Sequence, residues 1–461
     1  MKSIQYFIFI LFPVCVALVT ILFVNVSSIV SLLFYSLLFI IVWRIVLQWS
    51  DPLRGLGVFF FYAVLAVCLY EWQLLVIPGY FGFSGGLGVG TDDSYFYSLA
   101  AMDLPADFPV REYYWLRSHH YSDVLKIFSG LFTALYSDSH PLDLILFNVL
   151  GLSLVPFFSE KVAFLATNDS RTARFTFWTT LICPFLLANG LILIRDGWIA
   201  MLYIGAFYFL MTRQYLLLVG MLLGTFFLRM ESGLLLMFSV VLYGSMVGRL
   251  YSSEIADVTQ GWRSVPIILA ILTGLLILGI FVVAVIGIDQ IGVMAITRFY
   301  RVDFLESFIA QTNGVGGGGT FYKINQLPWF FSIPLGCIFF LGSPFFTVRE
   351  LMLDGNFIPR MLLANLFSIM FIWYFVYFSS AMVRILKGSN SVITILAFIF
   401  LIDVLVLSQA SMQIRHKIAL MPLFYVILGY GYVYRRTISV VVGSLFVSIS
   451  VVLVNMVAIV R

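Results

Sequence analysis

"LIRDGWIAMLYIGAFYFLMTRQYLLLVGMLLGTFFLRMESGLLL", residues 193–236, is the stretch that decides what kind of fold this chain can adopt. Its apolar runs are separated only by the short polar connections "TRQY" and "RMES". Apolar runs of this kind predict helices that cross a membrane, and short connections join antiparallel neighbours. The middle of the chain is therefore predicted to be a compact series of up-and-down helices.

The composition extends this prediction to the whole chain. Of the 461 residues, 62% are hydrophobic and 10% are charged, whereas soluble domains carry about 25% charged residues. The net charge of +4 is spread out, so no basic patch indicates nucleic acid. We expect a polytopic membrane protein that forms one integral-membrane domain over residues 1–461.

Apolar runs of roughly 20 residues recur from end to end, and the predicted fold is an all-α transmembrane bundle of about 13 helices. The first run lacks a convincing cleavage site, so we interpret it as a retained helix rather than a signal peptide. The four cysteines lie inside apolar segments without metal spacing and are expected to be packed thiols: Cys15, Cys68, Cys183 and Cys337. The predicted spans are 5–24, 27–49, 55–77, 141–159, 174–193, 196–212, 215–229, 232–249, 264–288, 361–386, 391–409, 416–433 and 438–459.

Two long polar interruptions, 78–140 and 289–326, separate these spans. The second contains a glycine-rich run that predicts a mobile loop. Lys and Arg concentrate in cytoplasmic loops of membrane proteins. With the N-terminus inside, both long loops fall outside, and the inner loops carry Arg44, Arg54, Lys161, Arg171, Arg174, Arg213, Arg249 and Arg263.

The segment 327–347, "LPWFFSIPLGCIFFLGSPFF" with the residue after it, decides the topology of the C-terminal part. If it crossed the membrane, it would place Arg384, Lys387, Arg435 and Arg436 outside. Its three prolines fit a broken helix better than a clean span. We therefore predict a re-entrant or interfacial element that leaves those four residues inside.

Polar groups converge on the outer face in this topology. Charged residues at the ends of apolar helices are costly to bury, so such a cluster is a functional-site hypothesis. The cluster contains Asp92, Asp93, His119, His120, His140, Arg195, Asp196, Arg229, Glu231, Lys323, Arg415, His416 and Lys417.

Each member also has a structural interpretation. Asp92 and Asp93 can cap the helix that "SYFYSLAAM" predicts, and Arg195 with Asp196 can form a local ion pair that closes a turn. Arg229 and Glu231 can be interfacial anchors. The adjacent His119 and His120 can lie at the membrane interface without a role in a site. The convergence of all of them on one face favours a site.

The chemistry of the set suits sugar transfer from an anionic lipid. Adjacent carboxylates can act as a general base toward a sugar hydroxyl or hold a divalent cation such as Mg²⁺ or Mn²⁺. Arginine and lysine suit phosphate groups. Neighbouring aromatic residues offer flat faces to sugar rings, among them Tyr95, Tyr97, Tyr113, Tyr114 and Trp115.

Several stretches resemble known membrane proteins. "GTDDSYFYSLA", residues 90–100, resembles the acidic motif of GT-C membrane glycosyltransferases. The stretch 193–236 and "QIRHKIALMPLFYVILGYG", residues 413–431, resemble segments of GT-C-like transferases and of O-antigen or exopolysaccharide polymerases from bacterial surface-polysaccharide clusters. The segment that begins at Leu327 resembles their "LP…GP" segment. Together these stretches cover about a third of the chain.

The resemblance implies an enzyme of the bacterial inner membrane with its active site facing the periplasm. The donor would be a sugar or oligosaccharide on undecaprenyl (pyro)phosphate, and the acceptor a glycan or lipid-linked glycan of O-antigen, capsule or exopolysaccharide. Asp92 or Asp93 would be the base or metal ligand, and Arg195, Arg229 and Arg415 would meet phosphate. Other polysaccharide-assembly proteins would be its partners.

The chain departs from the GT-C pattern in two ways. Its acidic loop follows the third predicted helix instead of the first, and only Arg461 follows the last span. The absence of a large C-terminal domain favours a glycan or lipid acceptor over a protein.

Other functions remain as alternatives. A transporter or flippase of lipid-linked sugars would place polar groups at mid-membrane depth and show inverted repeats. Asp403 and Asn365 are candidates for such groups, but no convincing internal repeat is present. A rhomboid-type protease is disfavoured because no suitable Ser and His pair lies on facing spans. A metalloenzyme built on His119 and His120 is disfavoured because adjacent helical residues do not share a face.

Overall fold

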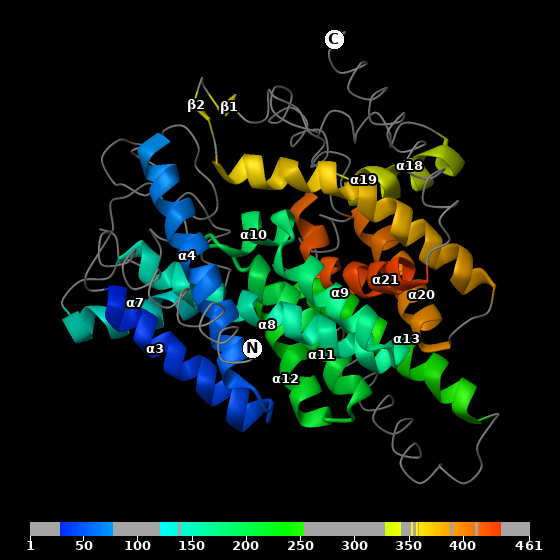
Figure 1. Cartoon of the computed structure of the whole chain (residues 1–461), viewed down its shortest axis with the longest axis horizontal. Coiled ribbons are helices and arrows are strands. Elements are labelled where there is room, and N and C mark those ends of the chain that lie inside the picture. Colours follow the sequence, from blue (N-terminus) through cyan, green and yellow to red (C-terminus); the bar gives the residue numbers. More distant parts are fainter. Residues whose placement is uncertain are drawn as a thin grey trace, which may run out of the picture.

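A computed structural model shows a bundle of helices and, among the described residues, one short strand pair that lies outside the bundle (Figure 1). The structure describes residues 28–76, 120–136, 140–252, 328–342, 352–353, 356–357, 359–387, 391–410 and 414–434. The helices of the first half are α3 (Ser28–Ile41), the π-helix η2 (Val42–Val46), α4 (Pro52–Val76), α7 (His120–Tyr136), α8 (Pro141–Thr167), α9 (Ser170–Leu181), α10 (Pro184–Gly190), α11 (Asp196–Met211), α12 (Tyr215–Leu228) and α13 (Met230–Ser252). The remaining elements are α18 (Trp329–Gly342), the antiparallel pair β1 (Met352–Leu353) and β2 (Asn356–Phe357), α19 (Pro359–Leu386), α20 (Ser391–Ala410), the 3-10 helix η5 (Ile414–Ala419) and α21 (Met421–Val433).

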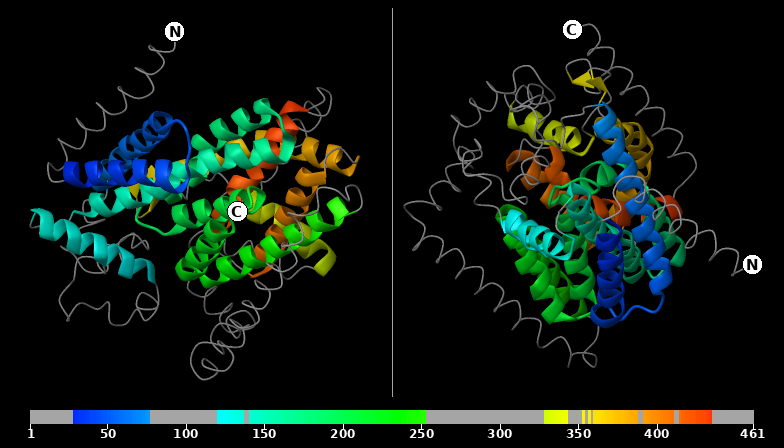
Figure 2. Two further views of the ribbon diagram at one scale, coloured as in Figure 1. Left: turned by 90° about the horizontal axis from the view of Figure 1, so that it is seen from below. Right: turned by 90° about the vertical axis from the view of Figure 1, so that its left-hand side faces the viewer.

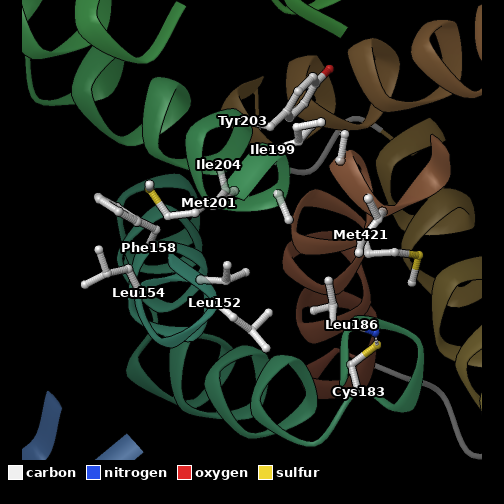
Figure 3. Packing of buried hydrophobic residues seen from close by; sticks show 14 of the residues in the cluster. Leu152, Leu154, Phe158, Cys183, Leu186, Ile199, Met201, Tyr203, Ile204 and Met421 are labelled. Carbon is white, nitrogen blue, oxygen red and sulfur yellow. Dashed lines mark hydrogen bonds between the residues drawn. The ribbon is translucent and has the colours of Figure 1, made fainter. Parts of the chain in front are cut away.

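Helix α8 lies at the centre of the bundle. It packs against α3, α4, α9, α11 and α21, and 94% of its most apolar 18-residue window is buried. A helix that is apolar on every side is buried on every side. Leu152, Leu154 and Phe158 of α8 meet the apolar side chains of α11 in this core (Figure 3).

The described helices run side by side, as the left view of Figure 2 shows, so the bundle has two ends. At one end Ser31 of α3 donates to Asp143 at the start of α8, at 2.6 Å. Arg229 meets Asp196 there, at the start of α11. We call this the Asp196 end. At the other end, the Arg54 end, Arg54 pairs with Glu160 near the end of α8, at 3.0 Å.

Basic side chains that the sequence predicts to be on one side lie together at the Arg54 end. The Arg54 guanidinium lies 4.2 Å from the centre of the Phe177 ring of α9, and Phe175 stacks on Tyr432 of α21 at 3.9 Å. Arg384 lies 4.4 Å from the ring centre of Tyr434, just after α21. These contacts place Arg384 at the same end as Arg54, as expected if 327–347 does not cross the membrane.

The turn from α8 into α9, also at this end, is held by Asp169. Its carboxylate caps α9 by accepting from the backbone amides of Arg171 and Thr172 and from the Thr172 hydroxyl. Partial burial tends to raise the pKa of Asp169, but these hydrogen bonds and the nearby Arg171 charge outweigh it and hold the pKa below its ordinary value. Asp169 is therefore ionised at neutral pH.

Three of the described helices are long and apolar enough to cross a membrane: Ser28–Val46, Pro52–Trp72 and Pro141–Thr167. A bent pair, Asn365–Phe371 with Trp373–Leu386, makes a fourth if it is one span. Other apolar helices are shorter, and a 16-residue helix extends about 24 Å against a hydrocarbon core of about 30 Å. These helices support a membrane protein, and the number thirteen is not confirmed. The predicted spans 5–24, 264–288 and 438–459 lie outside the described residues.

Two predicted spans are interrupted, and these predictions need correction. The span 174–193 breaks because Pro184 begins a new helix, α10, after α9 has ended at Leu181. The span 416–433 starts as η5 and becomes α-helical only at Met421, where Pro422 occupies the first turn.

The predicted loop 78–140 contains a helix, α7, that was not expected. Tyr121, Leu125 and Phe132 are buried on one side of it, whereas Ile127 is 70% and Leu135 is 56% exposed. Helix α7 packs against α8, and Phe132 contacts the rings of Phe34 and Tyr35 in α3.

The predicted re-entrant segment is represented by α18, which is continuous through Pro334. It packs against α20 and η5. Its 14 residues extend about 21 Å, less than the hydrocarbon thickness of about 30 Å. Residues 343–347 of the predicted segment lie outside the described residues, and the re-entrant or interfacial element stays a prediction.

Candidate functional site

The Asp196 end contains a stretch of non-helical backbone inside the bundle. After α9 ends, the Cys183 side chain accepts from the Leu186 amide at the start of α10, and residues 191–194 form bends. Helix α11 begins directly against this stretch, because a Cβ on Gly197 would lie 3.3 Å from the Gly190 Cα. Irregular backbone at membrane depth is tolerated where protein groups satisfy its hydrogen bonds.

Asn148 of α8 supplies those hydrogen bonds. Its side-chain amide donates to the backbone oxygens of Ile192 and Ile194, the second at 2.9 Å. The Tyr121 hydroxyl of α7 donates to Asn148 Oδ1. Asn148 and Tyr121 are both fully buried, so this polar group fixes the segment that leads into Arg195 and Asp196.

The turns "LIRDG" and "LRMES" are joined by two crossed contacts. Arg229 Nη2 donates to Asp196 Oδ1 at 2.6 Å, and Arg195 Nη1 donates to the Leu228 backbone oxygen at 2.8 Å. Arg229 ends α12 and Asp196 begins α11, where a carboxylate is favoured by the helix dipole. The two turns therefore form one rigid unit, although 33 residues separate the paired side chains.

Burial separates the roles of the two arginines. Asp196 is fully buried and Arg229 is 4% exposed, whereas Arg195 is half-buried. Asp196 pairs with Arg229, and the local Arg195–Asp196 ion pair considered from the sequence does not form among the described residues. Arg229 is suited to positioning the turns, and Arg195 is suited to meeting a ligand.

A second polar group begins α8. The His140 backbone amide donates to Asp143 Oδ2 at 2.9 Å, and His140 Nδ1 accepts from the Leu142 amide at 3.2 Å. The Tyr70 hydroxyl lies 3.4 Å from His140 Nε2. His140 and Asp143 form a capping box at the start of α8. The Tyr70 contact connects this cap to α4, and the Ser31 contact connects Asp143 to α3. His140 thus lies at the predicted end and serves as a helix cap.

Residues 414–417 of the "QIRHK" segment belong to η5, which packs against α10, α11 and α18. Lys417 is fully buried, and its ammonium donates to the Leu341 backbone oxygen at 2.9 Å. It also lies over the rings of Phe185 and Phe367, at 4.5 and 4.7 Å. This environment is suited to anchoring η5, whereas His416 is half-buried.

The remaining predicted site residues are only partly covered. Asp92, Asp93, His119 and Lys323 lie outside the described residues. For His120, Glu231 and Arg415 the structure describes the backbone, at the start of α7, in the first turn of α13 and in η5. Among the described residues, no group of three or more His, Cys, Asp or Glu side chains is arranged to hold a metal ion.

Sequence reasoning missed three residues that build this end: Tyr121, Asp143 and Asn148. The sequence could have indicated Asp143 as a capping residue, because it follows "HP" at the spacing of a capping box. It could also have indicated Asn148, because this residue is a lone amide in an apolar run.

Comparisons with known proteins place this chain in no family. No family model, curated protein or solved structure matches it. The resemblance to GT-C glycosyltransferases and polysaccharide polymerases therefore stays a prediction.

Proposed function

We propose that this chain is an integral-membrane glycosyltransferase that uses a lipid-linked donor. It transfers a sugar or oligosaccharide from undecaprenyl (pyro)phosphate to a glycan or lipid-linked acceptor during bacterial surface-polysaccharide synthesis. A repeat-unit polymerase is one form of this activity. The fold in this proposal is the GT-C-like bundle of about 13 helices expected from the sequence.

The observation that carries the proposal is the rigid unit formed by the two crossed turns. It holds Arg195 half-buried beside a non-helical segment, at one end of a bundle whose interior is mostly apolar. A guanidinium held in that way is preorganised for a lipid phosphate. Because η5 packs against α10 and α11, we assign Arg415 and His416 to the same site.

The positive-inside tendency supports the orientation. Arg54, Lys161, Arg171 and Arg384 mark the Arg54 end, which we assign to the cytoplasm. The Asp196 end then faces the periplasm, where lipid-linked sugars would be used. Within this proposal, Asp92 or Asp93 is the base or the ligand of a divalent cation.

The test replaces single residues in a host that lacks the chromosomal gene. Arg195→Ala, Asp92→Asn and Asp93→Asn are scored for polysaccharide length by gel, for lipid-linked intermediates, and for protein abundance. We expect at least tenfold less polymer from Arg195→Ala at normal abundance, because one charged hydrogen bond to phosphate contributes about 1.5–3 kcal/mol. Arg195→Lys should keep part of the activity because it retains the charge.

Arg171→Ala is the matched control, because it removes an arginine with a 78% exposed side chain from the Arg54 end. It should leave the polymer unchanged. Normal polymer from Arg195→Ala and both aspartate variants would refute the proposed site. Accumulation of single lipid-linked units would identify the polymerase form of the activity.

A transporter or flippase of lipid-linked sugars remains the second candidate because of one observation. Asp403 of α20 is fully buried among apolar helices, as intramembrane acids of transporters are. In reconstituted vesicles, movement of a lipid-linked sugar between leaflets without new glycosidic bonds would favour this function over transfer.

A further inference from the structure

Three described helices meet at a buried polar group that the sugar-transfer proposal does not use. The Tyr203 hydroxyl of α11 donates to Asp403 Oδ2, and Ser239 Oγ of α13 lies 2.7 Å from Asp403 Oδ1. Tyr203, Ser239 and Asp403 are each fully buried. Tyr203 stands at the edge of the apolar core with its hydroxyl pointing away from that cluster (Figure 3).

The hydrogen atoms needed by this group can be counted. Ser239 Oγ also lies 2.9 Å from the Leu235 backbone oxygen, one turn earlier in α13. Unless Ser239 divides its hydrogen between two acceptors, three short contacts take one hydrogen each: Tyr203 to Asp403, Asp403 to Ser239, and Ser239 to Leu235. The two hydroxyl groups supply only two hydrogens. A longer contact of 3.4 Å between Tyr203 and Ser239 adds no donor.

A proton on Asp403 completes the count. Asp403 Oδ1 then donates to Ser239, Ser239 donates to Leu235, and Tyr203 donates to Asp403 Oδ2. If the carboxyl were ionised, Asp403 and Leu235 would have to share the single Ser239 hydrogen in a three-centre bond, which weakens the hydrogen bond to each.

In the part of the chain that the structure describes, no compensating charge contacts Asp403. Among the described residues, no Lys, Arg or His nitrogen pairs with it. Tyr203 is the titratable group that contacts it, and α13 contributes only the Ser239 hydroxyl. An ionised carboxylate without a counter-charge is costly among spanning helices.

We propose that Asp403 is a proton-binding site, and that its neutral carboxylic acid joins α20 to α11 and α13. The inference is independent of the sugar-transfer proposal, because it uses none of the residues assigned to that site. The bound proton would stabilise the contact between two helices that adjoin the proposed site: α11 begins at Asp196, and η5 is the next described element after α20.

Infrared spectroscopy of the full chain in lipid nanodiscs at neutral pH tests this proposal. The difference between the wild type and Asp403→Asn should show the carbonyl band of one protonated carboxyl group in the wild type, shifted to lower frequency in heavy water. Ser239→Ala should move this band to higher frequency, because the carboxylic acid loses its acceptor. Asp169→Asn is the matched control, and it should remove carboxylate bands because Asp169 is ionised.

Thermal unfolding of the same variants gives a second measurement. Asp403→Asn keeps a neutral group that can accept from Tyr203 and donate to Ser239, so it should unfold close to the wild-type temperature. Asp403→Ala should unfold several degrees lower. Loss of carboxylate bands in Asp403→Asn, without loss of a protonated carboxyl band, would overturn the proposal.

Discussion

Individual polar side chains determine the geometry of the Asp196 end. Asp196 begins α11 and holds Arg229 at the end of α12, while Arg195 reaches the Leu228 carbonyl oxygen in the opposite direction. The pair Asp196–Arg229 is almost completely buried. Such a pair contributes little net stability compared with apolar residues, but removal of one member leaves a buried charge unpaired.

Arg229→Met should therefore destabilise the protein strongly. It leaves the Asp196 carboxylate in an apolar environment, at a cost of about 3–5 kcal/mol. Thermal unfolding in detergent measures the effect, with Arg171→Ala as the control that removes an exposed arginine. The double variant Asp196→Asn with Arg229→Met should recover part of the loss. An unfolding temperature of Arg229→Met equal to that of the control would contradict the assigned role.

At the scale of the helices, the ends of most apolar runs could be predicted from the sequence. The bounds of α4, α11, α12 and α20 lie within a few residues of the predictions, because polar residues interrupt the apolar pattern there. The break inside 174–193 was not predicted. Its irregular backbone is stabilised by Asn148, which lies 44 residues before Ile192 in the sequence. The apolar pattern of a segment does not predict a hydrogen-bond partner so far away in the sequence.

The candidate site was predictable to a similar extent. Charge at helix junctions identified Arg195, Asp196 and Arg229 as members of one polar cluster. The partner of each side chain could not be predicted, because pairing depends on how α11 and α12 pack. For the same reason, the sequence did not reveal that Lys417 is enclosed by Phe185 and Phe367.

Asn148→Leu should loosen the non-helical segment while the helices stay folded. The carbonyl oxygens of Ile192 and Ile194 lose their donors, so the backbone of 191–195 can open more often. Hydrogen exchange followed by mass spectrometry should show faster exchange in peptides that cover 184–196 and unchanged exchange in the second half of α8. Tyr121→Phe, which removes only the outer hydrogen bond, should have a smaller effect. Equal protection of 184–196 in Asn148→Leu and the wild type would show that Asn148 does not hold the segment.

At the scale of the whole molecule, the charges are divided between two ends. Arg54 with Glu160, Lys161 over Trp49, and Arg384 over Tyr434 lie at one end. Asp143, Asp196 and Arg229 lie at the other. The apolar bundle between them supports a membrane protein, and the excess of basic residues at the Arg54 end predicts its orientation.

Cysteine labelling tests this orientation. In a variant without the four native cysteines, Arg415→Cys and Asp92→Cys should react with a membrane-impermeant maleimide in intact cells. Arg171→Cys should react only after permeabilisation, because its side chain is exposed at the Arg54 end, which we propose to face the cytoplasm. Labelling of Arg171→Cys from outside, together with protection of the other two positions, would reverse the assigned topology.

The central position of α8 has a consequence for biosynthesis. Helix α8 ends at Thr167, yet part of its cover is α21, which begins at Met421 and is therefore made more than 250 residues later. While the ribosome extends the chain, the part of the α8 surface that α21 covers lacks this partner. Premature termination before α21 would leave the middle of the protein uncovered, and such fragments should be substrates for membrane quality-control proteases.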